Sequence, residues 1–396
     1  MTDKRYKKTI RACFTGYIVQ AIVNNFVPLL FLTFHNDFSI PLKDVTFLIT
    51  FNFGIQLTVD LISAKVIDKI GYRAGMIIAD ACSAAGLILL AVLPFVMKNP
   101  FAGLLVSVMV YAVGGGLTEV LVSPIMEACP TDSKESAMSL LHSFYCWGHV
   151  GVVLVSTLFF VAFGIENWRV LAALWAVVPI INLVSFTKAP IGSLIDEGET
   201  GLSFKELARK PLFWLLMLMM LCAGASEQAV SQWASTFAQT GLGVTKTLGD
   251  LFGPMMFAAL MGISRALYGK YGSKIDLNRF TAVCAALCAV SYLVIVFSDS
   301  AVAGLVAFGF VGLCVGIFWP GTFSMGAAGI RNGSTMMFAL FALAGDLGCV
   351  SGPTLAGIVS AANGDDLRTG IAAAVVFPAL MLTGTFLYRK KCKKTS

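Results

Sequence analysis

The sequence predicts an all-α integral membrane protein with twelve transmembrane helices in two six-helix halves, and three observations carry this prediction. Of the 396 residues, 57% are hydrophobic and only 13% are charged, with a mean hydropathy of +0.83. A soluble domain carries about 25% charged residues, so this chain lacks the polar surface that a soluble globule of its size needs. Apolar runs of about 20 residues recur along the chain, each long enough to span a bilayer. Short motifs of the first half also return in the second half.

A polar segment divides the apolar runs six and six. Residues 189–210 contain glycines and charges of both signs, whereas most other connections are short. We therefore expect an N-terminal half at 1–188, a cytoplasmic linker at 189–210 and a C-terminal half at 211–396, with the second part of the linker forming a short helix on the membrane surface. The predicted spans lie near residues 9–34, 44–69, 74–97, 101–126, 136–164, 168–188, 211–240, 247–272, 276–299, 302–330, 332–361 and 367–389.

The positions of Lys and Arg predict the orientation in the membrane. With both termini on the inner side, five of the 28 basic residues fall in outer loops, which leaves 28 − 5 = 23 on the inner side. Inner loops of membrane proteins carry such an excess of positive charge. We therefore expect a multi-pass protein of the cell inner (plasma) membrane with both termini cytoplasmic, and we interpret the net charge of +6 as an orientation signal rather than a nucleic-acid-binding surface. The five outer residues are Lys43, Lys98, Arg169, Lys246 and Arg368.

Several classes of site are not expected. The ten cysteines lie mostly inside apolar runs and show no ligand spacing, so we expect neither a disulfide framework nor a metal site. The basic amino terminus leads into an apolar segment that is too long for a cleavable signal peptide, so we treat it as the first span. The sequence contains no nucleotide-binding motif, which argues against an ATP-driven pump.

Two motifs indicate that the halves repeat one fold. Residues 63–71, which end in Asp68-Lys69-Ile70-Gly71, align with residues 264–272, 201 positions further on. Gly148-His149-Val150-Gly151 in span five aligns with Gly345-Asp346-Leu347-Gly348 in span eleven, 197 positions further on. Many secondary transporters place a solute site near the bilayer midplane between repeats of this kind.

With these spans and repeats, the sequence resembles the major facilitator superfamily over nearly its whole length. In the loop between spans two and three that family has a Gly, then Asp-Arg, then Gly-Arg-Arg; here these positions read Ala64, Asp68-Lys69 and Gly71-Tyr72-Arg73. Asn167-Trp168-Arg169 and Gly352-Pro353 also look like the family. The resemblance implies the major facilitator fold, and it implies that Asp68 and Arg73 form a charged latch that favours one access state.

A finer resemblance points to the fucose–proton symporter group and its sugar-transporting relatives. It rests on Glu227, with Trp233 six positions later, and on Leu141-His142-Ser143-Phe144 at the start of span five. That group has a Glu in span four, for which Glu119 is the counterpart, and an Asp in span one, which this chain lacks. The coupling ion is therefore left open between a proton and sodium. Val153-Leu154 stands where many drug antiporters have Gly-Pro, which counts against a drug exchanger.

Polar side chains follow single faces of the first two predicted spans. Gln20 and Asn24 share a face of span one, and amides suit hydroxyl recognition because they both donate and accept hydrogen bonds. The alternative is that these amides join helices to one another. In span two, Asn52, Gln56 and Asp60 lie at i, i+4 and i+8, and we expect a structural or gating contact for Asp60 because it lies about two turns from the latch.

Buried acids and histidines supply candidates for ion coupling. Glu119 lies near the middle of span four, where burial favours the protonated carboxyl and so suits reversible proton binding. The alternative is a permanent ion pair, although every Arg and Lys is expected at a helix end or in a loop. His142, Tyr145 and His149 share one face of span five, and they either contribute to the site or are merely hydrogen-bonded. Asp346 in span eleven either pairs with a basic group or binds a cation.

Span seven is expected to form the other side of the solute site. Gln228 and Gln232 lie at i and i+4, with Glu227 on a neighbouring stripe. Trp233 would stack on the apolar face of a sugar ring, as Tyr145 would. Trp319, which precedes Pro320, either does the same or packs at a bend.

These observations predict a secondary active transporter, not an enzyme, that moves a small neutral polyhydroxy solute such as a monosaccharide by alternating access. The expected coupling ion is a proton, with sodium as the competitor, and no other cofactor is expected. The expected partners are the solute and the lipid bilayer, and the chain is expected to work as a monomer. The candidates for solute binding are Gln20, Asn24, Asn25, Tyr145, His149, Gln228, Gln232, Trp233 and Trp319, those for ion coupling are Glu119, Glu227 and Asp346, and those for gating are Asp60, Asp68 and Arg73.

Three alternatives are weighed against this prediction. An anionic solute is disfavoured because the predicted cavity holds acids but no Arg or Lys at mid-depth. A proton-coupled exporter of lipophilic or cationic compounds would suit the acids and the many Phe, but not the amide face of span one. A receptor or scaffold that does not transport would lose the acids, which this chain keeps.

Overall fold

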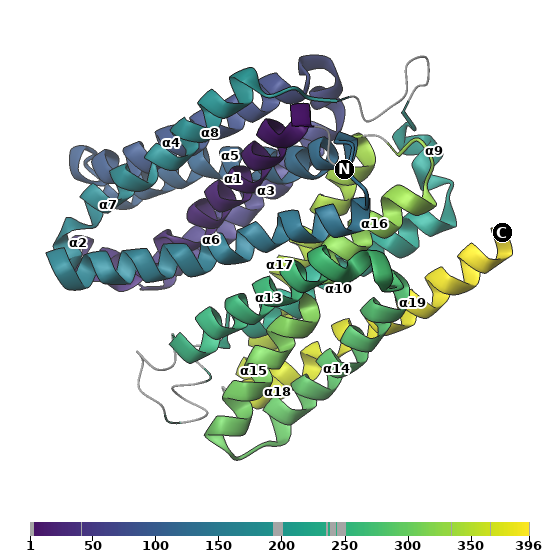
Figure 1. Cartoon of the computed structure of the whole chain (residues 1–396). Helices are drawn as coiled ribbons and strands as arrows, with labels where there is room; N and C mark the ends of the chain where they lie inside the picture. Colours follow the sequence, from purple (N-terminus) through teal and green to yellow (C-terminus); the bar gives the residue numbers. More distant parts are fainter. Residues whose placement is uncertain are drawn as a thin grey trace. The chain divides into compact units, whose positions relative to one another are not determined.

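The computed structural model describes residues 4–40, 42–192, 201–234, 237, 243, 251–333, 335–364 and 366–395, and every regular element among them is a helix. Ten helical segments within this part are long and apolar enough to cross a membrane. Two more helices, α3 (Leu42–Ile70) and α13 (Met256–Tyr271), occupy the predicted spans two and eight. The prediction of an all-α bundle of twelve transmembrane helices is therefore confirmed (Figure 1).

Two compact units make up the chain, and each is described by itself. Unit 1 comprises Met1–Asp132 and Phe144–Asp196, and unit 2 comprises Ser133–Ser143 and Glu197–Ser396. Residues 193–200 of the predicted linker lie outside the described residues, and the predicted halves and linker stay predictions.

The elements up to residue 192 form six spans, of which the first and the sixth are each built from more than one helical piece. In chain order they are η1 (Lys4–Tyr6), α1 (Lys7–Asn25), η2 (Val27–Leu30), α2 (Phe31–Phe38), α3, α4 (Tyr72–Val96), α5 (Pro100–Ala128), α6 (Lys134–Phe163), η3 (Ile165–Asn167), α7 (Trp168–Trp175) and α8 (Val177–Lys188).

The elements from residue 201 onwards belong to unit 2, and the label η4 denotes a π-helical turn. They are α9 (Phe204–Ala208), α10 (Pro211–Ser231), η4 (Leu251–Met255), α13, η5 (Gly272–Lys274), α14 (Leu277–Phe297), α15 (Ala301–Val315), α16 (Phe318–Gly329), α17 (Thr335–Ala362), α18 (Leu367–Ala374) and α19 (Val376–Thr395).

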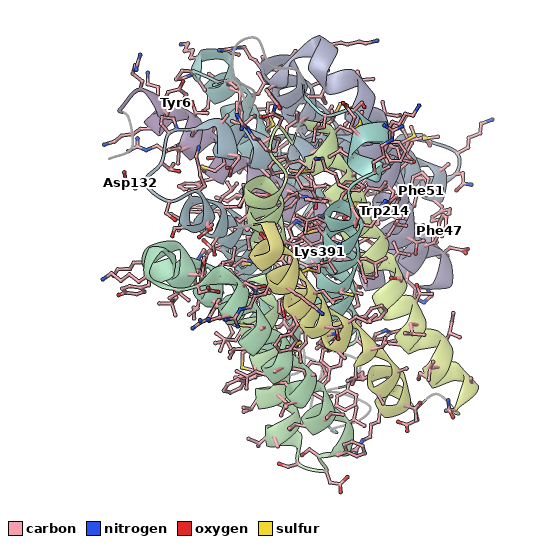
Figure 2. All side chains as sticks on the ribbon, turned by 90° about the vertical axis from the view of Figure 1, so that its right-hand side faces the viewer. Tyr6, Phe47, Phe51, Asp132, Trp214 and Lys391 are labelled. Carbon is pink, nitrogen blue, oxygen red and sulfur yellow. The ribbon has the colours of Figure 1, made fainter. Side chains whose placement is uncertain are left out.

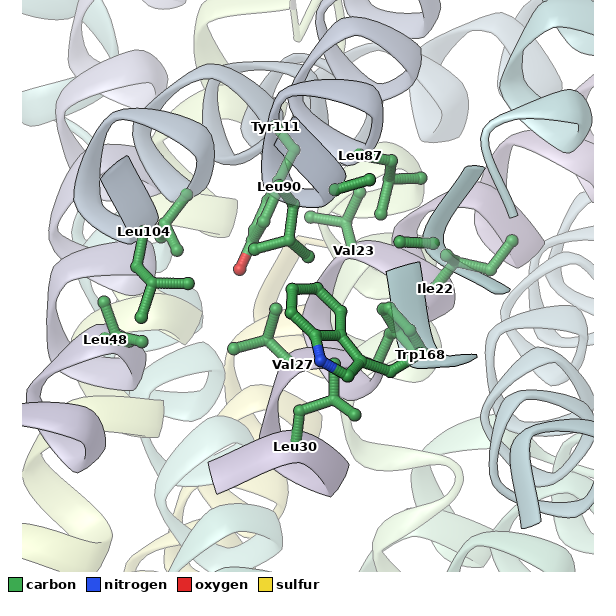
Figure 3. Close-up of a cluster of buried hydrophobic side chains, with 14 of the residues drawn as sticks. Ile22, Val23, Val27, Leu30, Leu48, Leu87, Leu90, Leu104, Tyr111 and Trp168 are labelled. Carbon is green, nitrogen blue, oxygen red and sulfur yellow. The ribbon is translucent and has the colours of Figure 1, made fainter. Parts of the chain in front are cut away.

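Helix α5 is central to unit 1, where it packs against α1, α3 and α4. The closest approach is to α4, because a Cβ atom at Gly86 would overlap the backbone of Tyr111 and one at Gly114 would overlap Ala79 and Ser83. Small residues let membrane helices pack backbone to backbone in this way. A cluster of buried hydrophobic side chains begins at this seam with Tyr111 and includes Trp168, which is 1% exposed (Figure 3). Trp168, matched to a family motif in the sequence, is thus a core residue.

Helices α10 and α17 form the corresponding seam of unit 2. A Cβ atom at Gly224 would overlap the backbone of Gly345, and one at Gly348 would overlap the backbone of Leu221. The glycines of the two helices therefore face one another, and this close contact fixes where the polar end of α10 lies against α17.

The outer surfaces of the units carry large apolar side chains. Phe47 on α3 is 48% exposed and Trp214 on α10 is 52% exposed, and both are labelled in Figure 2. Val161 near the end of α6 reaches 80% exposure. Such surfaces are unfavourable in water and suit contact with lipid chains.

The short helix expected in the second part of 189–210 is present as α9. Ser203 and Glu206 form a capping box, in which the Ser203 hydroxyl accepts from the Glu206 backbone amide and the Glu206 carboxylate accepts from that of Ser203. The hydrogen bonds from the Ser203 hydroxyl and backbone lower the pKa of Glu206 below its usual value. These caps define the start of α9 at Phe204.

Candidate functional site

In unit 1, the acid of span four is bound by an amide of span one. Gln20 on α1 donates from Nε2 to Oε2 of Glu119 on α5 at 2.5 Å. Gln20 is 3% exposed and Glu119 is 7% exposed, so both lie inside the unit. A candidate for ion coupling and a candidate for solute binding are therefore in direct contact.

One turn further along α1, Asn24 collects two amides from α3. Its Oδ1 accepts from Nδ2 of Asn52 at 3.1 Å and from Nε2 of Gln56 at 2.9 Å. Gly115 on α5 lies beside this arrangement: a Cβ atom there would be in tight contact with Val23 at 3.1 Å and in ordinary contact with Nε2 of Gln56 at 3.5 Å. The five side chains Gln20, Asn24, Asn52, Gln56 and Glu119 are called the amide cluster below.

The amide cluster has more acceptors than donors. Three of its carbonyl oxygens, Oε1 of Gln20, Oδ1 of Asn52 and Oε1 of Gln56, are buried and have no hydrogen-bond partner among the described residues. Buried carbonyl oxygens are normally paired, and leaving one unpaired costs about 1–3 kcal/mol. The cluster is therefore chemically complementary to a ligand that brings hydroxyl donors or a positive charge.

The other polar candidates of unit 1 lie outside the amide cluster. Asn25 donates from Nδ2 to the Ala21 carbonyl at 2.9 Å and to the Tyr145 hydroxyl at 3.4 Å. Asn25, Tyr145 and His149 are all half-buried. The hydroxyl of Tyr17 lies 3.0 Å from that of Ser123. The structure thus brings Asn25 and Tyr145 together, as a shared site would require.

In unit 2, Glu227 on α10 forms an ion pair with Arg265 on α13, with 3.3 Å between the Arg265 Nη2 and Oε2 of Glu227. Arg265 is 3% exposed and Glu227 is 8% exposed. The expectation that every Arg and Lys lies at a helix end or in a loop is therefore wrong. Arg265 lies within two turns of the end of α13, but its side chain points into the unit and not towards a helix end, because buried acceptors there bind the guanidinium.

One of those acceptors is created by a proline. In a continuous helix the carbonyl of Gly316 would accept from the amide of residue 320, but Pro320 has no N–H. Span ten is accordingly broken between Val315 and Phe318. The Arg265 Nε donates to the Gly316 carbonyl at 2.8 Å and so replaces the missing donor.

The amides of span seven continue from the ion pair in a line. Gln228 donates from Nε2 to Oε1 of Glu227 at 3.4 Å, and Gln232 donates from Nε2 to Oε1 of Gln228 at 3.1 Å. Gln228 is half-buried and Gln232 is exposed. The two candidates for solute binding are therefore linked to Glu227, and Gln232 is the accessible end.

The aromatic candidates of unit 2 are engaged in packing. Trp233 is half-buried and donates from Nε1 to the Pro353 carbonyl at 3.2 Å. Trp319 is 8% exposed, and its ring covers Gly345, where a Cβ atom would overlap it. The interpretation of Trp319 as packing at a bend has this contact in its favour. Asp346, next to Gly345, is 2% exposed.

The gating candidates were Asp60, Asp68 and Arg73, and the structure gives the side-chain positions of Asp60 and Arg73. The side chain of Asp68 lies outside the described residues, and Asp60 is 1% exposed inside unit 1. Arg73 donates to the carbonyls of Phe186, Thr187 and Ala189 at 2.6–3.1 Å, so it caps the end of α8. A cation at a helix C-terminus is stabilising, which gives Arg73 a structural role in unit 1 besides the gating role expected of it.

One buried acid was missed in the sequence. Asp80 on α4 is 0% exposed, and both its carboxylate oxygens accept from Nδ2 of Asn182 on α8, at 3.2 and 3.1 Å. A single Asp within the apolar run of span three was the available signal, since acids inside spans are costly and rarely without a role.

A membrane-spanning bundle with buried acids and amides in both units belongs to the class of membrane transporters. The chain belongs to the Major Facilitator Superfamily, whose family model matches residues 12–353. Both the resemblance to this superfamily and the fold that it implied are thereby confirmed. A sequence comparison with curated proteins finds no match.

Solved structures of this fold cover nearly the whole chain at low sequence identity. A Major Facilitator Superfamily transporter, FucP, in the outward conformation matches with a TM-score of 0.79 and 16% identity, over 97% of this chain and 99% of its own. The proton:xylose symporter XylE bound to 6-bromo-6-deoxy-D-glucose matches with a TM-score of 0.84 and 11% identity, over 98% and 96%. A bacterial homologue of the iron transporter ferroportin in an outward-facing state matches with a TM-score of 0.75 and 14% identity, over 96% and 99%. At such identities the likeness concerns the fold alone.

Proposed function

We propose that this transporter moves a small neutral polyhydroxy solute, such as a monosaccharide, by symport with a proton. The observation that carries the proposal is the amide cluster, in which three buried carbonyl oxygens have no hydrogen-bond partner among the described residues. The hydroxyl groups of a sugar supply the donors that these oxygens need, and each satisfied pair removes the cost of a buried unpaired acceptor.

The charges inside the units support a neutral solute. Arg265 is the buried base that an anionic solute would need, but its charge is met by Glu227 at 3.3 Å. A carboxylate or phosphate entering unit 2 would have to displace Glu227 and leave that acid buried without a partner, which is unfavourable. The preference against an anionic solute therefore remains, on the ground that Arg265 is already paired.

In this proposal Glu119 connects the cation with the solute. In the ionised state its carboxylate accepts from Gln20. Once protonated, the carboxyl has an O–H that can be donated and a weaker hold on the Gln20 amide, because charge-assisted hydrogen bonds are the stronger ones. Proton binding thereby changes what Gln20 offers to a solute, which is the link that symport requires. Sodium remains the competing ion.

Two of the similar solved structures support this proposal. One is described as a fucose:proton symporter from E. coli, and another as a proton:xylose symporter. We further propose that the protein works as a monomer in the inner (plasma) membrane with both termini cytoplasmic, in accordance with the distribution of its basic residues.

The test is a pH-sensitive dye inside proteoliposomes that contain the purified protein, screened with D-xylose, L-fucose and D-glucose beside lipophilic cations. We expect one sugar to move protons in the wild type and Glu119→Gln to abolish that proton movement. Exchange of internal for external radiolabelled sugar should survive in Glu119→Gln, because a neutral amide can still pair with Gln20. Asp37→Asn, which alters an exposed acid, serves as the matched control.

Three other outcomes of this experiment would contradict proton-coupled sugar symport or the role of Glu119 in it. Proton movement only with lipophilic cations would replace the proposal by an exporter. Sugar uptake without a proton signal would indicate sodium coupling or uniport, and the same vesicles with a sodium gradient would separate these two. Full proton coupling in Glu119→Gln would remove Glu119 from its role, and the test would then move to Asp346.

A further inference from the structure

A line of hydrogen bonds leads from an exposed amide of unit 2 to a buried guanidinium. Gln232 donates to Gln228, Gln228 donates to Glu227, and Arg265 donates to the other oxygen of Glu227. Exposure falls along this line, from Gln232, which is exposed, to Arg265, which is 3% exposed. Among the described residues, Glu227 receives hydrogen bonds from Gln228 and Arg265.

Beyond Glu227, Arg265 reaches two backbone carbonyls on other elements. Its Nε donates to Gly316 at the break of span ten at 2.8 Å, and its Nη1 donates to His142 on α6 at 3.1 Å. The planar fork of an Arg side chain can serve several acceptors at fixed angles, which the single ammonium of a Lys cannot do. One side chain therefore holds α10, α6 and the broken helix at once.

The contact with α6 is reciprocal and close. Ser139 Oγ donates to the backbone carbonyl of Arg265 at 2.8 Å. One turn along α13, a Cβ atom at Gly269 would lie 2.8–3.1 Å from Leu140. The segment Ser133–Ser143 belongs to unit 2. It is joined to α13 by side-chain hydrogen bonds in both directions, and it packs closely against α13 at Gly269.

We propose that Arg265 is a positioning residue that transmits the state of Glu227 to the segment Ser133–Ser143 and to the break of span ten. Separating this buried ion pair would leave an uncompensated charge, so we expect a displacement of Glu227 to displace Arg265 with it. A solute bound at Gln228 and Gln232, or a proton bound at Glu227, would thereby alter the hydrogen bonds that Arg265 donates to the carbonyls of His142 and Gly316. This inference rests on the proposed function only for the identity of the solute.

The test compares amide hydrogen exchange in the full-length protein in lipid nanodiscs, without any solute, for peptides covering 133–143 and 314–322. Arg265→Lys keeps the positive charge beside Glu227 but loses the fork. We expect exchange in both peptides to accelerate at least about tenfold, because each loses a hydrogen bond from a charged donor. The exposed Arg279 on α14 provides the control Arg279→Lys, which should leave both peptides unchanged.

The transmission itself is tested by a double-mutant cycle. Glu227→Gln alone should accelerate exchange at 133–143. The hydrogen bonds given for Glu227 go to Gln228 and Arg265, which lie outside that segment, so the effect would have to pass through Arg265. In the Arg265→Lys background the same change should add nothing, because the connection is already lost. Additive effects would overturn the proposal.

Two further outcomes would also overturn it. Wild-type exchange of both peptides in Arg265→Lys would show that Arg265 merely neutralises Glu227. An equal acceleration in the peptide of α14, 277–297, would show a general loss of stability instead of a local release. Since no solute is present, failure here leaves the symport proposal intact, and failure of sugar transport leaves this result intact.

Discussion

At the scale of single residues, the pair Asp80 and Asn182 is the polar contact whose loss should be most damaging to unit 1. Both oxygens of Asp80 receive their hydrogen bond from the one amide nitrogen, and Oδ1 of Asn182 is itself buried without a partner among the described residues. An ionised carboxylate buried with one amide donor is costly, so we propose that the pair acts as a neutral carboxylic acid joined to an amide.

This interpretation predicts an asymmetric set of variants. Asn182→Leu should lower the free energy of unfolding by about 1–3 kcal/mol, because Asp80 is left buried without a donor. Asp80→Asn should stay close to wild type, because it retains the shape and the hydrogen bond of a neutral acid. The double variant Asp80→Leu/Asn182→Leu should be more stable than Asn182→Leu alone, because no polar group is then left unpaired.

The measurement is the apparent unfolding temperature in detergent, followed by intrinsic fluorescence. If Asp80→Asn were as unstable as Asn182→Leu, a charged carboxylate would be required at this position and the neutral pair would be the wrong description.

At the residue scale, residue type and spacing predict which polar side chains share a helix face, whereas their role in a solute site stays a prediction. The i, i+4 spacing of Gln20 and Asn24 predicted a shared polar face, and the structure places both in the amide cluster. Arg265 was misjudged because distance from a helix end does not determine where a long side chain points. An Arg near a helix end can extend its charge towards water or, as here, bury it against an acid and two carbonyls.

At the scale of elements, apolar length alone located the spans, since a helix needs about 20 residues to cross the hydrocarbon. What length could not show is where a span is interrupted. Span ten breaks at Gly316 because Pro320 withholds its amide, and the break persists because Arg265, from another helix, satisfies the carbonyl. Such a break depends on a tertiary partner, so the sequence of span ten alone does not determine it.

Two glycines that align in the sequence repeat provide a matched experiment on helix packing. A Cβ atom at Gly348 on α17 would overlap the backbone of Leu221 on α10, whereas one at Gly151 on α6 meets no described atom within 4 Å. We expect Gly348→Ala to cost about 1–3 kcal/mol through overpacking. Gly151→Ala should be neutral or slightly stabilising, because Ala is the better helix former.

Thermal unfolding of the two variants in the same detergent provides the comparison. Equal stability would mean that α10 and α17 can separate freely at Gly348, and the close seam of unit 2 would then not be a fixed contact.

At the scale of the whole molecule, composition was sufficient to predict a membrane protein, repeated motifs to predict two related halves, and the loop motif ending in Gly71-Tyr72-Arg73 to indicate its family. The solute and the coupling ion were not accessible in the same way, because they depend on the pairing of buried polar groups. Glu119, Glu227 and Asp346 look alike in the sequence. In the structure Glu119 accepts from Gln20 whereas Glu227 is paired with Arg265, so the candidates for ion coupling stand in different environments.

The orientation in the membrane is the prediction that concerns the whole chain. With 23 of the 28 basic residues on the inner side, inverting the chain would carry most of its positive charge across the membrane, which is strongly disfavoured. We expect a fluorescent C-terminal green fluorescent protein fusion, and active alkaline phosphatase when the reporter is fused after Lys98 or Asp299. The same reporter fused after Asp132, in a predicted inner loop, is the control and should be inactive. A dark C-terminal fusion together with active phosphatase after Asp132 would reverse the orientation, and the candidate latch at Asp68 and Arg73 would then lie on the outer side, where it could not hold a cytoplasmic gate.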